Sequence, residues 1–99
     1  MKDKALRLLG LCKRAGKCIA GESMCEKAVQ KGEAHLIVLD ALTGANTTDR
    51  FKRLSETYNV ALIRLEGAAA TVGSPDKRVI VVLEQGFASR VMIEMQGCE

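Results

Sequence analysis

Short strand-like runs separated by helical segments constrain the fold of this chain more than any other feature. The runs lie at 36–39 (Leu-Ile-Val-Leu), 61–64 (Ala-Leu-Ile-Arg) and 79–83 (Val-Ile-Val-Val-Leu). Each is too short for a helix, and a strand that is apolar at every position needs cover on both faces. Helices must therefore lie on both sides of the sheet. We expect an α/β fold, a three-layer α-β-α sandwich.

Helical periodicity and helix-ending residues define the remaining segments. Asp3 can cap the first helix, and Asn46 or Thr47 can cap the third, in which Phe51 and Tyr58 face inward. The expected helices span 3–15, 22–31, 46–58, 66–71 and 85–95, and a short extended piece lies at 17–19.

Length and composition indicate a single globular domain, residues 1–99, because 99 residues suffice for one core. Hydrophobic residues make up 47 % and charged residues 27 %, which is typical of a folded chain. The first residues lead into a charged amphipathic stretch rather than an apolar leader. No apolar run reaches the roughly 20 residues of a membrane span. We expect a cytoplasmic protein that does not contact membranes.

Four cysteines could suggest a metal site or disulfides. They are Cys12, Cys18, Cys25 and Cys98, and none forms the close pair that zinc sites usually contain. Without an export signal, disulfides are not expected either. We predict reduced thiols, with no metal or other cofactor.

No pattern of residues indicates catalysis. The stretch from Gly10 to Cys18 resembles a phosphate-binding loop, but five residues separate its glycines where four are required. Cys18 also replaces the Ser or Thr that would hold magnesium. His35 is the single histidine, and no carboxylate is placed to orient it. We expect neither an enzyme nor a small-molecule substrate.

Basic residues concentrate in the first third of the chain. Residues 1–31 hold eight of the fifteen Lys and Arg but only three of the twelve acids, a net charge of +5, whereas the whole chain carries +3. Such asymmetry fits a surface that binds phosphate. An ordinary solvated helix surface remains the alternative on charge alone.

Gly21 precedes the second expected helix and defines a candidate site. A glycine at this position lets the free amides of a helix N-terminus approach a ligand backbone closely. Lys27 follows about one and a half turns later, and Lys31 lies on the same helix face as Lys27. With Lys13, Arg14 and Lys17 from the preceding segment, these cations could receive an RNA backbone. The alternative is that Gly21 only permits a tight turn.

Several motifs together resemble a known family. They are Leu8-Leu9-Gly10-Leu-x-x-Arg14-Ala15-Gly16-Lys17, Gly21-(five residues)-Lys27-Ala28-Val29-x-x-Gly32, the strand at 36–39, Asn46-Thr47, Tyr58-Asn59-Val60, and Arg78-Val79 with Gly86-Phe87-Ala88. In this order and spacing, over roughly residues 5–92, they resemble the L-seven-Ae and L-thirty-e superfamily of ribosomal proteins. Members of this superfamily bind kink-turn RNA. The nearer match is its bacterial YlxQ-like branch.

The resemblance implies an L-thirty-e-like fold with a small mixed sheet and a site for a sharply bent RNA internal loop. The family's Gly-x-Asn-Glu-x-x-Lys motif, which meets the sheared G·A pairs, matches here at Gly21 and Lys27. Ser23 stands at the Asn position and Met24 at the Glu position, so the two-pronged contact and the carboxylate acceptor are missing. From the charge pattern and the resemblance together, we expect these RNA-binding residues: Lys13, Arg14, Lys17, Gly21, Glu22, Ser23, Lys27, Lys31, Thr71, Lys77 and Arg78.

The loop at 71–78 would close this site from the other side, although it is polar where the family's loop is apolar. We therefore expect a non-catalytic protein that binds structured RNA, such as a kink-turn or ribosomal RNA, in association with ribosomes. The rival hypothesis is a protein–protein adapter built on the same fold.

Overall fold

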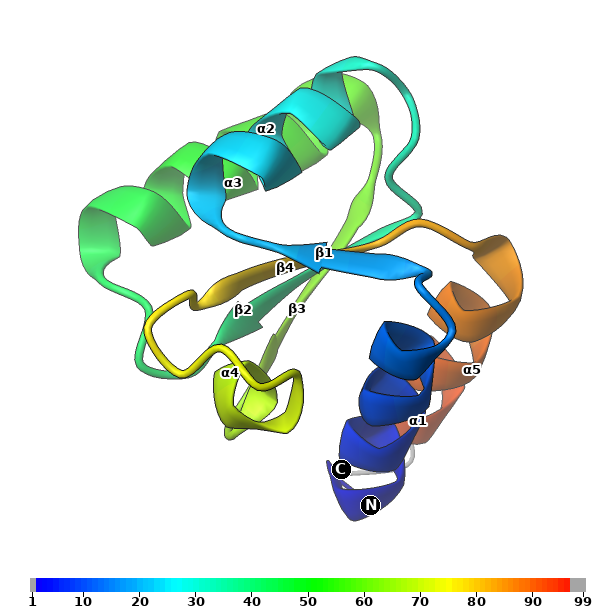
Figure 1. Ribbon diagram of the computed structural model, residues 1–99. Coiled ribbons are helices and arrows are strands. Elements are labelled where there is room, and N and C mark those ends of the chain that lie inside the picture. The colour runs from blue at the N-terminus through cyan, green and yellow to red at the C-terminus, as the bar shows by residue number, and fades with distance from the viewer. Residues whose placement is uncertain (1, 97–99) are drawn as a thin grey trace.

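The computed structural model describes residues 2–96 (Figure 1). Its helices are α1 (Lys2–Arg14), α2 (Glu22–Gln30), α3 (Ala45–Tyr58), α4 (Ala68–Thr71) and α5 (Gln85–Gln96). Its strands are β1 (Cys18–Ala20), β2 (Leu36–Asp40), β3 (Ala61–Leu65) and β4 (Val79–Val82). Every element expected from the sequence is present, with boundaries that shift by a residue or two.

The four strands form one mixed sheet in the order β1-β4-β2-β3. β4 pairs antiparallel with both β1 and β2, while β2 and β3 run parallel. The two central strands, β2 and β4, are buried at every residue, as their continuous apolar sequences predict.

Two hydrophobic cores lie on opposite faces of the sheet, since successive strand residues point to opposite sides. Leu36 and Val38 pack with residues of α1, α4 and α5. Ile37 and Leu39 pack with residues of α2 and α3. Figure 1 shows the same division, with α2 and α3 over one face and α1 and α5 over the other. The predicted α-β-α sandwich and the mixed sheet are therefore confirmed.

Two helix starts differ from the sequence-based expectation. α1 includes Asp3 in its first turn instead of beginning after it. The carboxylate in this position still stabilises the helix, because it lies near the positive end of the helix dipole. α3 begins at Ala45 with Gly44 as its N-cap, so the prediction that Asn46 or Thr47 caps it was wrong. A turn in which the Thr43 N–H donates to the Asp40 carbonyl at 2.9 Å directs the chain into the helix earlier than expected.

Tyr58 was expected to face inward, but its side chain is 42 % exposed. It is the last residue of α3, and Asn59 follows in the left-handed conformation that ends the helix. Phe51, two turns earlier, is fully buried as predicted. Among residues 2–96, none of the helices has the length and apolar character needed to cross a membrane.

Candidate nucleic-acid interface

One end of the sheet gathers the loops around the N-terminus of α2. The Gly21 N–H donates to the Val79 carbonyl at 2.9 Å, and the Asp40 N–H donates to the Arg78 carbonyl at 2.8 Å. The end of β1, the end of β2 and the start of β4 therefore meet there. The loop at 73–78 lies beside the first residues of α2 because β1 and β4 are paired.

Gly21 is the N-cap of α2 and has a φ of 113° and a ψ of 139°. Residues with a side chain rarely adopt this backbone conformation, so position 21 requires a glycine. No side chain caps the helix, and Glu22, Ser23 and Met24 are exposed. The first amides of a helix have no partner within it, so this end presents N–H donors and a positive dipole to a ligand.

Lys77 lies directly beside this helix end. Its Cδ atom is 3.7 Å from the position that a Cβ on Gly21 would occupy. The structure thus brings together two of the residues that the sequence assigned to the site, although 56 positions separate them in the chain. A cation next to free amides is an arrangement suited to phosphate.

The Glu22 carboxylate is bound by two side chains of α3. Its Oε1 accepts from Arg50 Nη2 at 2.9 Å and from Thr47 Oγ1 at 3.4 Å. Arg50 Nε also lies 3.7 Å from Glu26 Oε1. The ion pair locally balances the negative charge at this end of α2. The role of Arg50 could not be predicted from the sequence, because this contact spans 28 positions and no local pattern indicates it.

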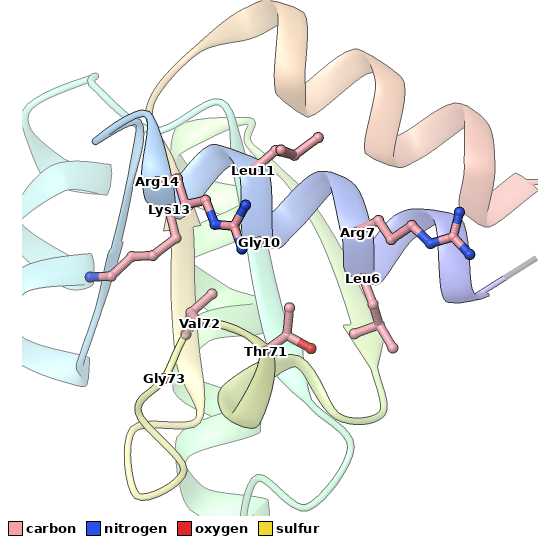
Figure 2. Close-up of a pocket in the computed structure, with 9 residues that line it drawn as sticks. All are labelled: Leu6, Arg7, Gly10, Leu11, Lys13, Arg14, Thr71, Val72 and Gly73. Atoms are coloured by element: carbon pink, nitrogen blue, oxygen red, sulfur yellow. The ribbon is translucent and has the colours of Figure 1, made fainter.

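A groove between α1 and α4 contains the second cluster of predicted residues (Figure 2). Its volume is about 630 Å³. We define the α1–α4 groove by three cations (Arg7, Lys13, Arg14), three apolar side chains (Leu6, Leu11, Val72) and Gly10, Thr71 and Gly73. Lys13, Arg14 and Thr71 therefore come together. Gly73 begins the loop that ends beside Gly21, so the same loop borders both clusters.

Arg7 also lines the groove but was not among the predicted site residues. It lies seven positions before Arg14, a spacing that places both residues on the same face of a helix. The signal was therefore present in the sequence. Three cations from one helix now line a single concave surface.

Other predicted cations lie further away. Lys17 lies at the opposite end of β1, where its carbonyl accepts from the Leu83 N–H at 2.7 Å. Measured along the strand, its backbone is about 13 Å from that of Gly21. Lys31 is the C-cap of α2, about 15 Å along the helix from Gly21, and Lys27 is about 9 Å along it. The structure does not gather Lys17 and Lys31 around the helix N-terminus.

Arg78 contacts the loop that follows β2. Its Nη1 donates to the Leu42 carbonyl at 3.4 Å, and the Leu42 side chain beyond it is 71 % exposed. Met24, on the first turn of α2, is 57 % exposed. These apolar side chains border the cationic surface at the same end of the sheet. The sequence did not single out Leu42, since its exposure depends on the turn that follows β2.

A buried carboxylate holds these loops in place. Asp40 is only 5 % exposed. Its Oδ1 accepts from the Leu42 N–H at 3.0 Å, and its Oδ2 accepts from the Ala69 N–H in α4 at 2.9 Å. Asp40 thus fixes both the loop after β2 and the short helix that leads to the 73–78 loop.

The described thiols belong to the core. Cys12, Cys18 and Cys25 are buried and unpaired, while Cys98 lies outside the described residues. The hydrogen bond between Cys12 and Cys18 raises the pKa of Cys12 and lowers that of Cys18. Burial raises the pKa of Cys25 to about 12. Within residues 2–96, no three His, Cys, Asp or Glu side chains form a group that could hold a metal ion.

The fold resembles those of several solved structures, and two of them illustrate the likeness. A Bacillus halodurans C protein of unknown function superposes with a TM-score of 0.89 at 27 % identity, over 94 % of this chain and 97 % of that one. A 15.5kD RNA binding protein from Giardia lamblia superposes with a TM-score of 0.77 at 14 % identity, over 93 % of this chain and 84 % of that one. The second likeness concerns the fold alone.

Comparison with curated proteins gives a relative in Bacillus subtilis, the RNA-binding protein YlxQ. It is 30 % identical over 88 residues, which cover 86 % of this chain and 88 % of the relative. No protein-family model matches the chain. The identity and its coverage confirm the resemblance found from the motifs. The chain belongs to the YlxQ family, in agreement with its L-thirty-e-like fold.

Proposed function

We propose that this protein binds structured RNA without catalysing a reaction on it. The observation that carries the proposal is the position of Lys77 beside the uncapped N-terminus of α2, with its Cδ atom 3.7 Å from where a Cβ on Gly21 would lie. The RNA backbone can accept hydrogen bonds from the free N–H groups of this helix end and can pair with the positive charge of Lys77. The name of the Bacillus subtilis relative supports RNA as the ligand.

The proposed interface begins at Gly21–Met24, crosses the loop at 73–78 and continues into the α1–α4 groove. Lys13 and Arg14 bind phosphates from the groove, and Lys27 and Arg78 contribute charge nearby. Lys17 and Lys31 serve only an RNA long enough to extend past the opposite end of β1. We further propose that the RNA is a kink-turn-like internal loop or part of ribosomal RNA, bound in the cytoplasm in association with ribosomes.

An adapter function has less support from the surface. Among the described residues, each of five elements carries one large exposed apolar side chain. They are Leu11 on α1, Met24 on α2, Tyr58 on α3, Ile93 on α5 and Leu42 in the loop after β2. No one element presents an apolar stripe of the kind that docks a partner protein. Three of the cations, in contrast, line one groove: Arg7, Lys13 and Arg14.

The test is the salt dependence of binding to a fluorescently labelled kink-turn RNA, measured by anisotropy between about 50 and 300 mM KCl. Each neutralised phosphate contributes roughly 0.7–0.9 to the slope of log K against log [salt]. The Lys13→Ala/Arg14→Ala/Lys17→Ala variant should flatten the slope, and most of that change should persist in Lys13→Ala/Arg14→Ala. An unchanged slope in both variants would place the RNA elsewhere.

A further inference from the structure

A second concave cationic surface lies between α1 and α5, outside the interface proposed above. Its volume is about 330 Å³, and five described residues line it: Lys4, Arg7, Leu8, Arg90 and Glu94. We define these residues as the α1–α5 patch. The two helices pack side by side (Figure 1), so a cation from the last helix joins two from the first. Three cations and one acid give the patch a net charge of +2.

The three cations of the patch are accessible to a partner. Lys4, Arg7 and Arg90 are all exposed, and none of them takes part in the ion pairs found among the described residues. Arg50 on α3 differs, since two carboxylates of α2 lie beside it. Like charges on one concave surface repel one another and attract anions. The patch is therefore suited to a polyanion.

Arg7 connects the α1–α5 patch with the proposed RNA interface. It lines both the patch and the α1–α4 groove. Figure 2 shows Arg7 and Arg14 toward opposite ends of that groove. At 1.5 Å per residue, Arg7 lies about 10 Å and Lys4 about 15 Å along the helix axis from Arg14. The cations thus continue from the groove along α1 and onto α5.

We propose that the α1–α5 patch binds phosphates of a base-paired stem that extends from the internal loop bound at the N-terminus of α2. This inference rests on the proposed function and adds to it a second contact region, which holds the stem rather than the loop. No aromatic side chain is among the described residues of the patch, so it offers no ring on which a base could stack. Exposed Lys and Arg side chains suit phosphate contacts, which position an RNA without reading its sequence.

Charge and continuity favour RNA over a protein as the occupant. The apolar residue of the patch, Leu8, is half-buried, so the patch does not present the large apolar anchor that a protein partner usually needs. Because Arg7 already belongs to the proposed RNA interface, an RNA that continues past it reaches Lys4 and Arg90 next. An acidic protein segment is the competing occupant.

Stem length is the variable that tests the proposal. Each stem of a fluorescently labelled kink-turn RNA is lengthened in turn by about one helical turn, and the salt dependence of binding is measured for the short and long forms. In wild type, lengthening one stem should steepen the slope of log K against log [salt] by roughly 1.4–1.8, because Lys4 and Arg90 neutralise two phosphates at about 0.7–0.9 each. A changed stem sequence of the same length should leave the slope as it was.

The variant Lys4→Gln/Arg90→Gln removes two charges of the patch and leaves the groove intact. It should bind the short RNA as wild type does, and it should lose the added slope with the long stem. The matched control is Lys52→Gln/Arg53→Gln, which removes one Lys and one Arg from exposed positions of α3 and should keep the added slope. Since all four positions are exposed, the thermal midpoint of each variant should stay within about 4 °C of wild type.

Two results would overturn the proposal. In the first, stem length changes the slope equally in wild type and in Lys4→Gln/Arg90→Gln, or changes it in neither. In the second, a labelled polyglutamate peptide binds wild type, fails to bind the same variant and does not compete with the long RNA, which would assign the patch to an acidic protein. Failure of wild type to bind even the short RNA would refute the proposed function itself, a result distinct from both.

Discussion

Replacing Asp40 with asparagine should destabilise the protein by about 2–4 kcal/mol. The carboxylate accepts from the Leu42 N–H at 3.0 Å and from the Ala69 N–H at 2.9 Å while only 5 % exposed. A carboxamide has one oxygen, so one of the two amides would face an NH₂ group and remain unsatisfied, at a cost of about 1–3 kcal/mol. The remaining bond would lose its charge assistance, which is worth about 1 kcal/mol more.

Urea denaturation followed by circular dichroism measures this loss, and an unchanged m-value would show that the unfolded state is the same. For a domain of this size the thermal midpoint should fall by roughly 8–30 °C. The matched control is Asp49→Asn, at an exposed position of α3, which should change stability by less than about 0.5 kcal/mol. A loss below about 0.5 kcal/mol for Asp40→Asn would refute the view that this carboxylate anchors α4 and the loop after β2.

Three other experiments test the predictions. The double substitution Ser23→Asn with Met24→Glu should increase, by about ten-fold or more, the preference for a kink-turn RNA over the same RNA without its G·A pairs, because a bidentate base contact is worth about 1–3 kcal/mol. An unchanged preference in competition binding would show that the mapped positions do not face the base pairs. Gly21→Ala should cost roughly 1–3 kcal/mol of stability because of its φ of 113°, and a neutral effect on the urea midpoint would contradict the assigned conformation. Freshly purified, tag-free protein should contain no stoichiometric zinc by mass spectrometry. Its buried Cys12, Cys18 and Cys25 should react with a disulfide reagent only after unfolding, so rapid reaction of all three in the native state would contradict their burial.

The fold followed from the sequence because its strands carry a strong signal. A run such as Leu36–Leu39 has no polar position, so it fits only the middle of a covered sheet. The start of α3 could not be predicted in the same way. Asn46 and Thr47 are good capping residues, but the turn between Asp40 and Thr43 starts the helix before them. A local turn, and not the capping preference of these residues, decided the boundary there.

The parts of the candidate site that depend on local sequence could be predicted, whereas those that depend on contacts between distant segments could not. Gly21 was recognised from its place before a helix. The position of Lys77 beside Gly21 and the ion pair between Glu22 and Arg50 depend on which segments the fold brings together. Arg7 could have been found from its seven-residue spacing to Arg14. The large backbone separation of Lys17 from Gly21 became evident only from the direction of β1.

Amide chemical shifts recorded while a kink-turn RNA is added to the isotope-labelled protein test the central claim most directly. We predict that the largest changes fall on Gly21–Met24, on the loop at 73–78 and on Gly10 and Arg14 in α1. Signals from β3 and from the exposed face of α3 should stay in place. Large shifts confined to those elements, with residues 21–24 and 73–78 unmoved, would contradict it.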